Sequence, residues 1–179
     1  MTLPRLCALP LALLALPLAL LTSSPAQAGE IKGAEAFDRI KTLAGTWNSV
    51  SGEADAKDET WTHEFRVSAA GSVVMEIMAP ESPYEMINMY HLDGGELVLT
   101  HYCAAGNQPT MRLDTAASDA DHYVFTFTGG TNLDPAVDTH IHAGEIDFEG
   151  DNSLESKWTG WSQGKPGDTS AFHLVRAGS

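Results

Sequence analysis

Most of this chain consists of short segments in which apolar and polar residues alternate, separated by turns rich in glycine. Residues 60–69 show the pattern clearly, with Trp61, His63, Phe65 and Val67 at every second position. A period of two places neighbouring side chains on opposite faces of a β-strand. The repetition of such segments predicts an all-β fold built from antiparallel strands.

The pattern predicts about ten strands preceded by a short amphipathic helix at residues 34–43. The first strand opens at Gly45, and the others cover residues 60–69, 72–78, 84–92, 96–103, 110–114, 121–128, 139–148, 154–161 and 169–176. Asp93-Gly94-Gly95-Glu96 is the strongest hairpin signal. Tight turns between sequential strands favour an up-and-down meander, and closing the meander into a barrel removes the exposed edges. A ten-stranded barrel is wide enough to hold a small ligand, and a sandwich is the alternative fold.

The first 28 residues have the character of a secretory signal peptide. Arg5 precedes an apolar stretch at residues 11–21, and Ala26-Gln27-Ala28 offers the small residues that a signal peptidase requires. The apolar stretch is too short for a transmembrane helix. We therefore expect cleavage after Ala28, a single domain at residues 29–179, no remaining membrane anchor, and a bacterial periplasmic or secreted location.

Charge and cysteine content narrow the classes of function. The chain has 24 acidic and 10 basic residues and a net charge of −14, which argues against nucleic-acid binding and against a basic membrane-surface module. Cys7 leaves with the signal peptide, so Cys103 is the one remaining cysteine and no intramolecular disulfide can form. We expect a small-molecule ligand as the partner, and the sequence does not indicate an oligomeric state.

Strand alternation also predicts which polar residues face the interior of the barrel. With Gly94-Gly95 as the turn centre, Asn88 lies opposite His101, and Met86 opposite Cys103. His91, His122 and His173 are expected to face outward. The predicted ligand-binding residues are His63, Asn88, Tyr90, His101, Cys103, His140, His142 and Trp158, with Met75 and Met86 beside them.

Several functions are compatible with a histidine-rich interior. It can be a hydrogen-bonded polar network without a ligand, or a cavity that binds a small organic molecule. It can also be a metal or haem site, or a periplasmic enzyme, that uses His101, Cys103, His140 and His142. The sequence contains no Ser-His-Asp motif, phosphate loop or nucleotide fingerprint, so it favours a binding protein over an enzyme and leaves any cofactor open. A barrel simply filled with side chains, acting as an interaction module, is the third class.

The helix that leads into Gly45-Thr46-Trp47, combined with the meander, resembles the calycins, a group that includes lipocalins, fatty-acid-binding proteins and nitrobindin-like haem barrels. The resemblance implies an interior ligand site. Nitrobindin-like proteins have Gly-x-Trp-x-Gly-x-Gly, whereas here Asn48-Ser49-Val50-Ser51-Gly52 follows the tryptophan. The haem histidine of those proteins lies near the C-terminal end, where His173 is the only candidate. The stretches 90–94, 100–109 and 140–142 are also similar to exported bacterial proteins of unknown function, a resemblance that implies no activity.

Overall fold

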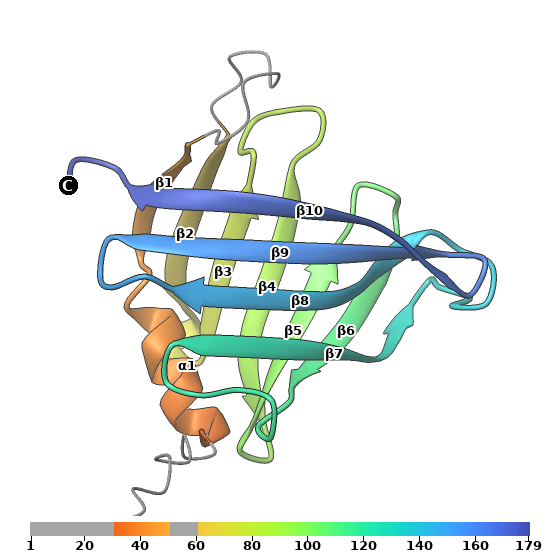
Figure 1. Cartoon of the computed structure of the whole chain (residues 1–179), viewed down its shortest axis with the longest axis horizontal. Helices are drawn as coiled ribbons and strands as arrows, with labels where there is room; N and C mark the ends of the chain where they lie inside the picture. The colour runs from red at the N-terminus through yellow and green to blue at the C-terminus, as the bar shows by residue number, and fades with distance from the viewer. Residues whose placement is uncertain (1–30, 51–60) are drawn as a thin grey trace, which may run out of the picture.

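The protein is a closed barrel of ten antiparallel strands (Figure 1). The computed structural model describes residues 31–50 and 61–179. Each strand pairs with its neighbours in the sequence, and the first strand also pairs with the last. The predicted up-and-down barrel is therefore confirmed, and the sandwich alternative is wrong. The predicted signal peptide at residues 1–28 lies outside the described residues.

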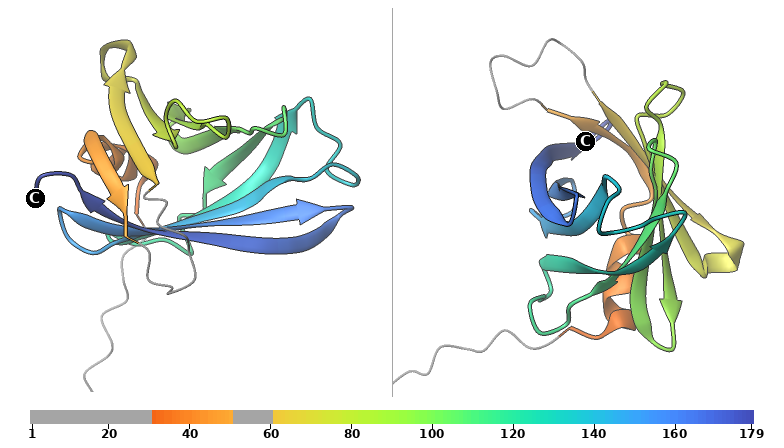
Figure 2. Two further views of the ribbon diagram at one scale, coloured as in Figure 1. Left: turned by 90° about the horizontal axis from the view of Figure 1, so that it is seen from above. Right: turned by 90° about the vertical axis from the view of Figure 1, so that its right-hand side faces the viewer.

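The helix and strands lie close to their predicted positions. In chain order they are α1 (Gly33–Lys41), β1 (Gly45–Ser49), β2 (Thr62–Ser68), the short 3-10 helix η1 (Ala69–Gly71), β3 (Val73–Met78), β4 (Met86–Asp93), β5 (Glu96–Tyr102), β6 (Gln108–Leu113), β7 (His122–Thr131), β8 (His140–Phe148), β9 (Ser153–Ser162) and β10 (Lys165–Arg176). The β9–β10 hairpin extends beyond the shorter strands (Figure 2). Among the described residues, no helix has the length and apolar character needed to cross a membrane.

Helix α1 covers one end of the barrel, which we call the helix end. Phe37 and Ile40 are buried there, at 2% and 0% exposure. Gly33 lies against the β4–β5 turn so closely that a Cβ atom would be 2.4 Å from the carbonyl oxygen of Gly95. The Arg176 guanidinium lies over the Trp47 ring and donates to the carbonyl oxygens of Thr42 and Ala44, both at 2.9 Å. These contacts join the C-terminal end of α1 to the first and last strands.

The opposite end of the barrel, which we call the open end, is formed by every second connection. Because the chain reverses direction at each turn, the β3–β4, β5–β6, β7–β8 and β9–β10 connections all lie away from α1. The strands therefore start or finish there within a few residues of His63, Asn88, His101 and His140.

The register of the β4–β5 hairpin is the one that its turn predicts. Gly94 and Gly95 both have positive φ, at 61° and 94°, which glycine adopts without a steric penalty. Asp93 consequently pairs with Glu96, and Asn88 pairs with His101. The ladder ends at Ile87–Tyr102, so Met86 and Cys103 are not paired as expected.

Candidate functional site

A carboxylate, Glu76, lies inside the barrel. It pairs with Phe65 on β2 and Asn88 on β4, and it is 1% exposed. Met75, which we expected inside, instead pairs with Arg66 and lies on the opposite face, so that prediction is wrong. Val73–Met78 reads VVMEIM, in which apolar residues on both faces conceal the alternation. An acidic residue isolated in such a strand was the signal that could have revealed Glu76.

Glu76 is the hub of a hydrogen-bonded network, the Glu76 network, formed by His63, Glu76, Asn88, Tyr90 and His101. His63 Nδ1 donates to Oε1 at 2.8 Å, while Asn88 Nδ2 and the Tyr90 hydroxyl donate to Oε2 at 2.8 and 2.7 Å. Burial raises the pKa of the Glu76 carboxyl, but the hydrogen bonds and the charge of His63 outweigh burial and lower the pKa overall. The carboxylate is therefore ionised, and both of its oxygens accept hydrogen bonds from the network.

Through Asn88, this carboxylate determines which ring nitrogen of His101 carries the proton. An ionised carboxylate can only accept, so Asn88 must direct its NH₂ group at Glu76 and its Oδ1 at His101. His101 Nδ1 lies 2.7 Å from that oxygen and must carry the proton. Burial lowers the pKa of His101 to about 4, so the ring is neutral near pH 7. His101 Nε2 therefore presents a lone pair and acts as an acceptor.

Three ring nitrogen atoms in this part of the interior lack hydrogen-bond partners among the described residues. They are His63 Nε2, His101 Nε2 and Trp158 Nε1, and all three are sealed from solvent. An unsatisfied buried polar atom costs about 1 to 3 kcal/mol. The open side of the interior thus retains hydrogen-bonding capacity that the protein itself does not use.

Trp158 is seated on β9 against a glycine of the neighbouring strand. Gly144 pairs with Trp158, and a Cβ atom at Gly144 would lie 2.5 Å from Cζ3 of the indole. The His101 and Trp158 rings are within 20° of parallel, with centroids 6.4 Å apart. The absence of a side chain at Gly144 therefore allows Trp158 to occupy its place beside His101.

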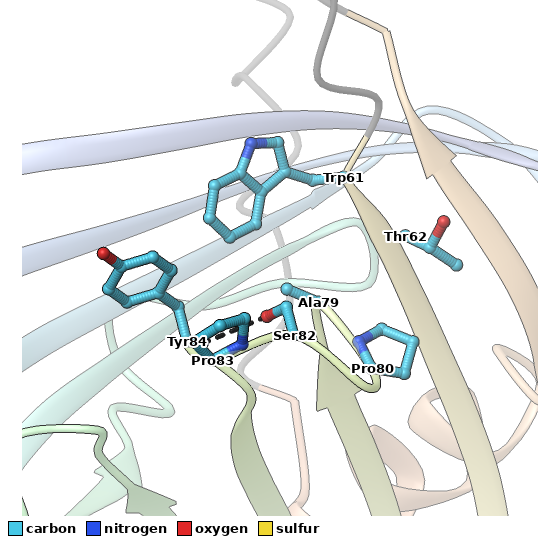
Figure 3. A pocket seen from close by; sticks show the side chains of 7 residues that line it. All are labelled: Trp61, Thr62, Ala79, Pro80, Ser82, Pro83 and Tyr84. Atoms are coloured by element: carbon cyan, nitrogen blue, oxygen red, sulfur yellow. Dashed lines mark hydrogen bonds between the residues drawn. The ribbon is translucent and has the colours of Figure 1, made fainter.

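An open pocket of about 580 Å³, the mouth pocket, lies at the start of β2 and in the β3–β4 connection (Figure 3). It is lined by Trp61, Thr62, Ala79, Pro80, Ser82, Pro83 and Tyr84. Figure 3 shows the Trp61 indole above the turn that carries the prolines, with the Tyr84 ring beside it. Tyr84 is 66% exposed, so the pocket is accessible from outside.

Phe172 on β10 connects the mouth pocket to the Glu76 network. Its ring lies 6.4 Å from the Trp61 ring and 5.3 Å from the His63 ring, measured between centroids. Phe172 is half-buried and packs against the core. Its ring therefore lies close both to Trp61, which lines the pocket, and to the buried His63.

His140 and His142 form a separate cluster on β8. His140 Nδ1 donates to the carbonyl oxygen of Asp138 at 2.8 Å, and its Nε2 lies 2.9 Å from His142 Nδ1. The β8–β9 register shifts at this point, and His142 stacks between Phe127 and Trp161, with centroids 4.4 and 3.9 Å away. Burial and the neighbouring His140 lower the pKa of His142.

Cys103 lies just beyond the end of β5, in the β5–β6 connection, and is half-buried. Its Sγ accepts a hydrogen bond from the backbone N–H of Ala105 at 3.4 Å. Across residues 31–50 and 61–179, no three histidine, cysteine, aspartate or glutamate side chains form a group that could hold a metal ion. His101, Cys103 and the β8 histidines are thus not brought together as one ligand set within the described structure.

The structure confirms several predicted side-chain directions. His63, Asn88, Tyr90, His101, His140 and Trp158 are buried, at 3% exposure or less. His173 has 41% side-chain exposure and lies near Glu149, and His122 pairs with Asp147. The outward direction expected for His173 is thus confirmed. The interior His63, Asn88, Tyr90 and His101 are joined through Glu76, which sequence reasoning missed, as it also missed the residues that line the mouth pocket.

The barrel, with one short α-helix in the described residues, fits a calycin-like barrel in shape. A comparison with models of known protein families found no match, and a search of curated proteins found no relative.

Proposed function

We propose that this protein is an exported, calycin-like barrel that binds a small, partly apolar molecule at its open end. The observation that carries the proposal is the mouth pocket, whose Trp61 is linked through the Phe172 ring to His63, a buried residue with an Nε2 atom that lacks a partner in the described chain. Ligand sites are concave, largely apolar and supplied with a few placed polar groups. The aromatic and proline walls of the pocket supply the apolar surface, and the Glu76 network orients the polar groups.

The size of the mouth pocket also supports binding of a small molecule. Its volume of about 580 Å³ falls within the range of roughly 300 to 1,000 Å³ that is common for small-molecule sites. The Phe172 ring lies close to both Trp61 of this pocket and His63, so a ligand that displaces the ring reaches the interior. The unsatisfied nitrogens then gain partners, which offsets their cost in the free protein.

The calycin and export parts of the proposal depend on the sequence. Gly45 and Trp47 open the first strand, and Trp47 is fully buried with its Nε1 donating to the Leu43 carbonyl oxygen at 2.7 Å. Residues 1–28 supply the signal-peptide pattern. Fractionation of the host cell should recover the protein outside the cytoplasm, and N-terminal sequencing should begin at Gly29. A cytoplasmic protein that retains Met1 would contradict export.

The ligand is tested by native mass spectrometry of protein purified from its own host, together with elemental analysis of the same sample. We expect one small organic molecule per chain, and its loss in a Trp61→Ala, Tyr84→Ala double variant. Tyr102→Ala is the matched control, because Tyr102 is an exposed aromatic residue outside the pocket. If the purified protein carries no bound small molecule, or if the double variant still binds that molecule at full occupancy, the proposed site is refuted. A stoichiometric metal would instead support the metal class that uses His101, Cys103, His140 and His142.

A further inference from the structure

We propose that His101 and Trp158 recognise a hydroxyl group of the ligand, which donates to His101 Nε2 and accepts from Trp158 Nε1. The inference rests on the proposed ligand-binding function and specifies the chemistry of the ligand. Both nitrogen atoms are buried and lack partners in the described residues. The ligand class is an uncharged molecule with an apolar body and one hydroxyl group, such as a phenol or an alcohol.

The acceptor half of the pair is set by the Glu76 network. Glu76 orients the Asn88 amide, and the Asn88 oxygen keeps the proton of His101 on Nδ1. Nε2 of the neutral ring can then only accept a hydrogen bond. A ligand group that hydrogen-bonds to His101 Nε2 must therefore be a donor.

The donor half is set by the chemistry of indole, since Trp158 Nε1–H can only donate. The indole packs directly against Gly144 of β8, where a Cβ atom would lie 2.5 Å from Cζ3 of the ring, so it has no room to move closer to that strand. The near-parallel rings of His101 and Trp158 have centroids 6.4 Å apart. The acceptor and the donor are thus carried by neighbouring rings of the interior.

The oxygen of a hydroxyl group, like that of water, can satisfy both nitrogen atoms, whereas the other common functional groups of a ligand cannot. A carbonyl or ether oxygen accepts from Trp158 and leaves His101 unpaired, whereas an ammonium group donates to His101 and leaves Trp158 unpaired. A carboxylate brings no hydrogen and places a second negative charge near ionised Glu76. The pair therefore selects for a neutral donor and acceptor on the same atom.

The position of the pair is compatible with entry through the open end. His101 is one residue from the end of β5, and β9 continues from Trp158 to the β9–β10 connection at the same end. The Phe172 ring lies close to both Trp61 of the mouth pocket and His63, the other end of the Glu76 network. Because the nitrogens are sealed from solvent, side chains at the open end must part before the ligand reaches them.

Three probes of one shape test the inference: 2-naphthol, 2-methoxynaphthalene and naphthalene, titrated at pH 7 by calorimetry. The naphthol donates and accepts, the methyl ether only accepts, and naphthalene does neither. We expect 2-naphthol to bind about tenfold more tightly than the other two, the effect of one well-formed hydrogen bond or more. Trp158→Phe and His101→Phe keep an aromatic ring but remove one partner each, and each should reduce the preference to within about twofold.

Trp161→Phe and His122→Phe are the matched controls, because Trp161 on β9 stacks on His142 and His122 pairs with Asp147 on the outer face. Both should keep the preference, and circular dichroism establishes that each variant is folded. Equal binding of the three probes, or an unchanged preference in Trp158→Phe, overturns the hydroxyl inference and leaves the proposed function standing. Failure of 2-naphthol to bind at all also overturns it, and the proposed function is then decided by native mass spectrometry alone.

Discussion

The two ends of the barrel interior are built on different principles. At the helix end, Phe37, Ile40, Leu97 and Leu174 bury apolar surface, and the buried Trp47 has its one polar atom paired. At the open end, a carboxylate and three histidines are buried, and two of the histidines have a ring nitrogen left unpaired in the described structure. Apolar burial at the helix end stabilises the fold, whereas the unpaired ring nitrogens at the open end reduce stability while the network keeps its polar groups oriented.

The largest expected effect on stability comes from comparing one shape-conserving substitution at each end of the barrel. Glu76→Gln keeps the shape but turns one acceptor oxygen into an NH₂ donor that faces other donors, so we expect a loss of about 3 to 5 kcal/mol in the free energy of unfolding. Leu97→Met, a volume-conserving change at a buried apolar position of the helix end, should cost less than about 1.5 kcal/mol. Urea denaturation measures both. Equal losses of unfolding free energy would show that the hydrogen bonds of the Glu76 network do not make the open end more sensitive to substitution than the apolar helix end.

Acid should weaken the polar end through His101. An unfolded histidine titrates near 6.5, whereas burial lowers the pKa of His101 to about 4. Between these values the unfolded state binds the proton and the folded state does not, so the free energy of unfolding falls as the pH drops, by about 3 kcal/mol in total. Below about pH 4 both states are protonated and this loss stops.

The variant His101→Gln isolates this contribution, because His142, whose pKa is also lowered, is still present. Urea titrations between pH 4.5 and 6.5 should show a shallower dependence in the variant than in the wild type. Parallel curves would mean that His101 is not buried in its neutral form.

A smaller loss of stability is expected when the space that Gly144 leaves for Trp158 is filled. Gly144→Ala places a methyl group against the indole, so we expect a loss of about 2 kcal/mol as the ring is displaced. Gly160→Ala on the same hairpin is the control, since its nearest neighbour would be 3.5 Å away, an ordinary contact. Thermal unfolding of the two variants tests the difference, and similar melting temperatures would show that Trp158 has room to shift.

The smallest effect is expected at the helix end, where Arg176 contacts Trp47 and two carbonyl oxygens. Arg176→Met should cost about 1 kcal/mol, because a partly exposed cation–π contact and its hydrogen bonds contribute modestly. Arg66→Met removes an exposed ion pair with Glu64 and should change stability by less than about 0.5 kcal/mol. A loss of several kcal/mol in the free energy of unfolding for Arg176→Met would show that the polar contacts at the helix end contribute as much to stability as the Glu76 network.

The fold could be predicted because alternation and turn residues act locally. Gly94-Gly95 alone determined that Asn88 lies opposite His101, and the structure bears this out. Periodicity failed where both faces of a strand are apolar, as around Glu76, and it could not anticipate the register shift at His142. Alternation reports the face on which a residue lies but not its partners, so the buried histidines were found and the carboxylate that organises them was not.

The pairing of β1 with β10 has a consequence for how the molecule is made. The two strands that close the barrel come from opposite ends of the described sequence, so no closed structure exists until the last strand has been synthesised. Contacts between distant segments form slowly, because the loop between them must close first. If the chain is exported, this delay gives the translocation machinery an unfolded substrate, and assembly is completed only after the C-terminal strand has crossed.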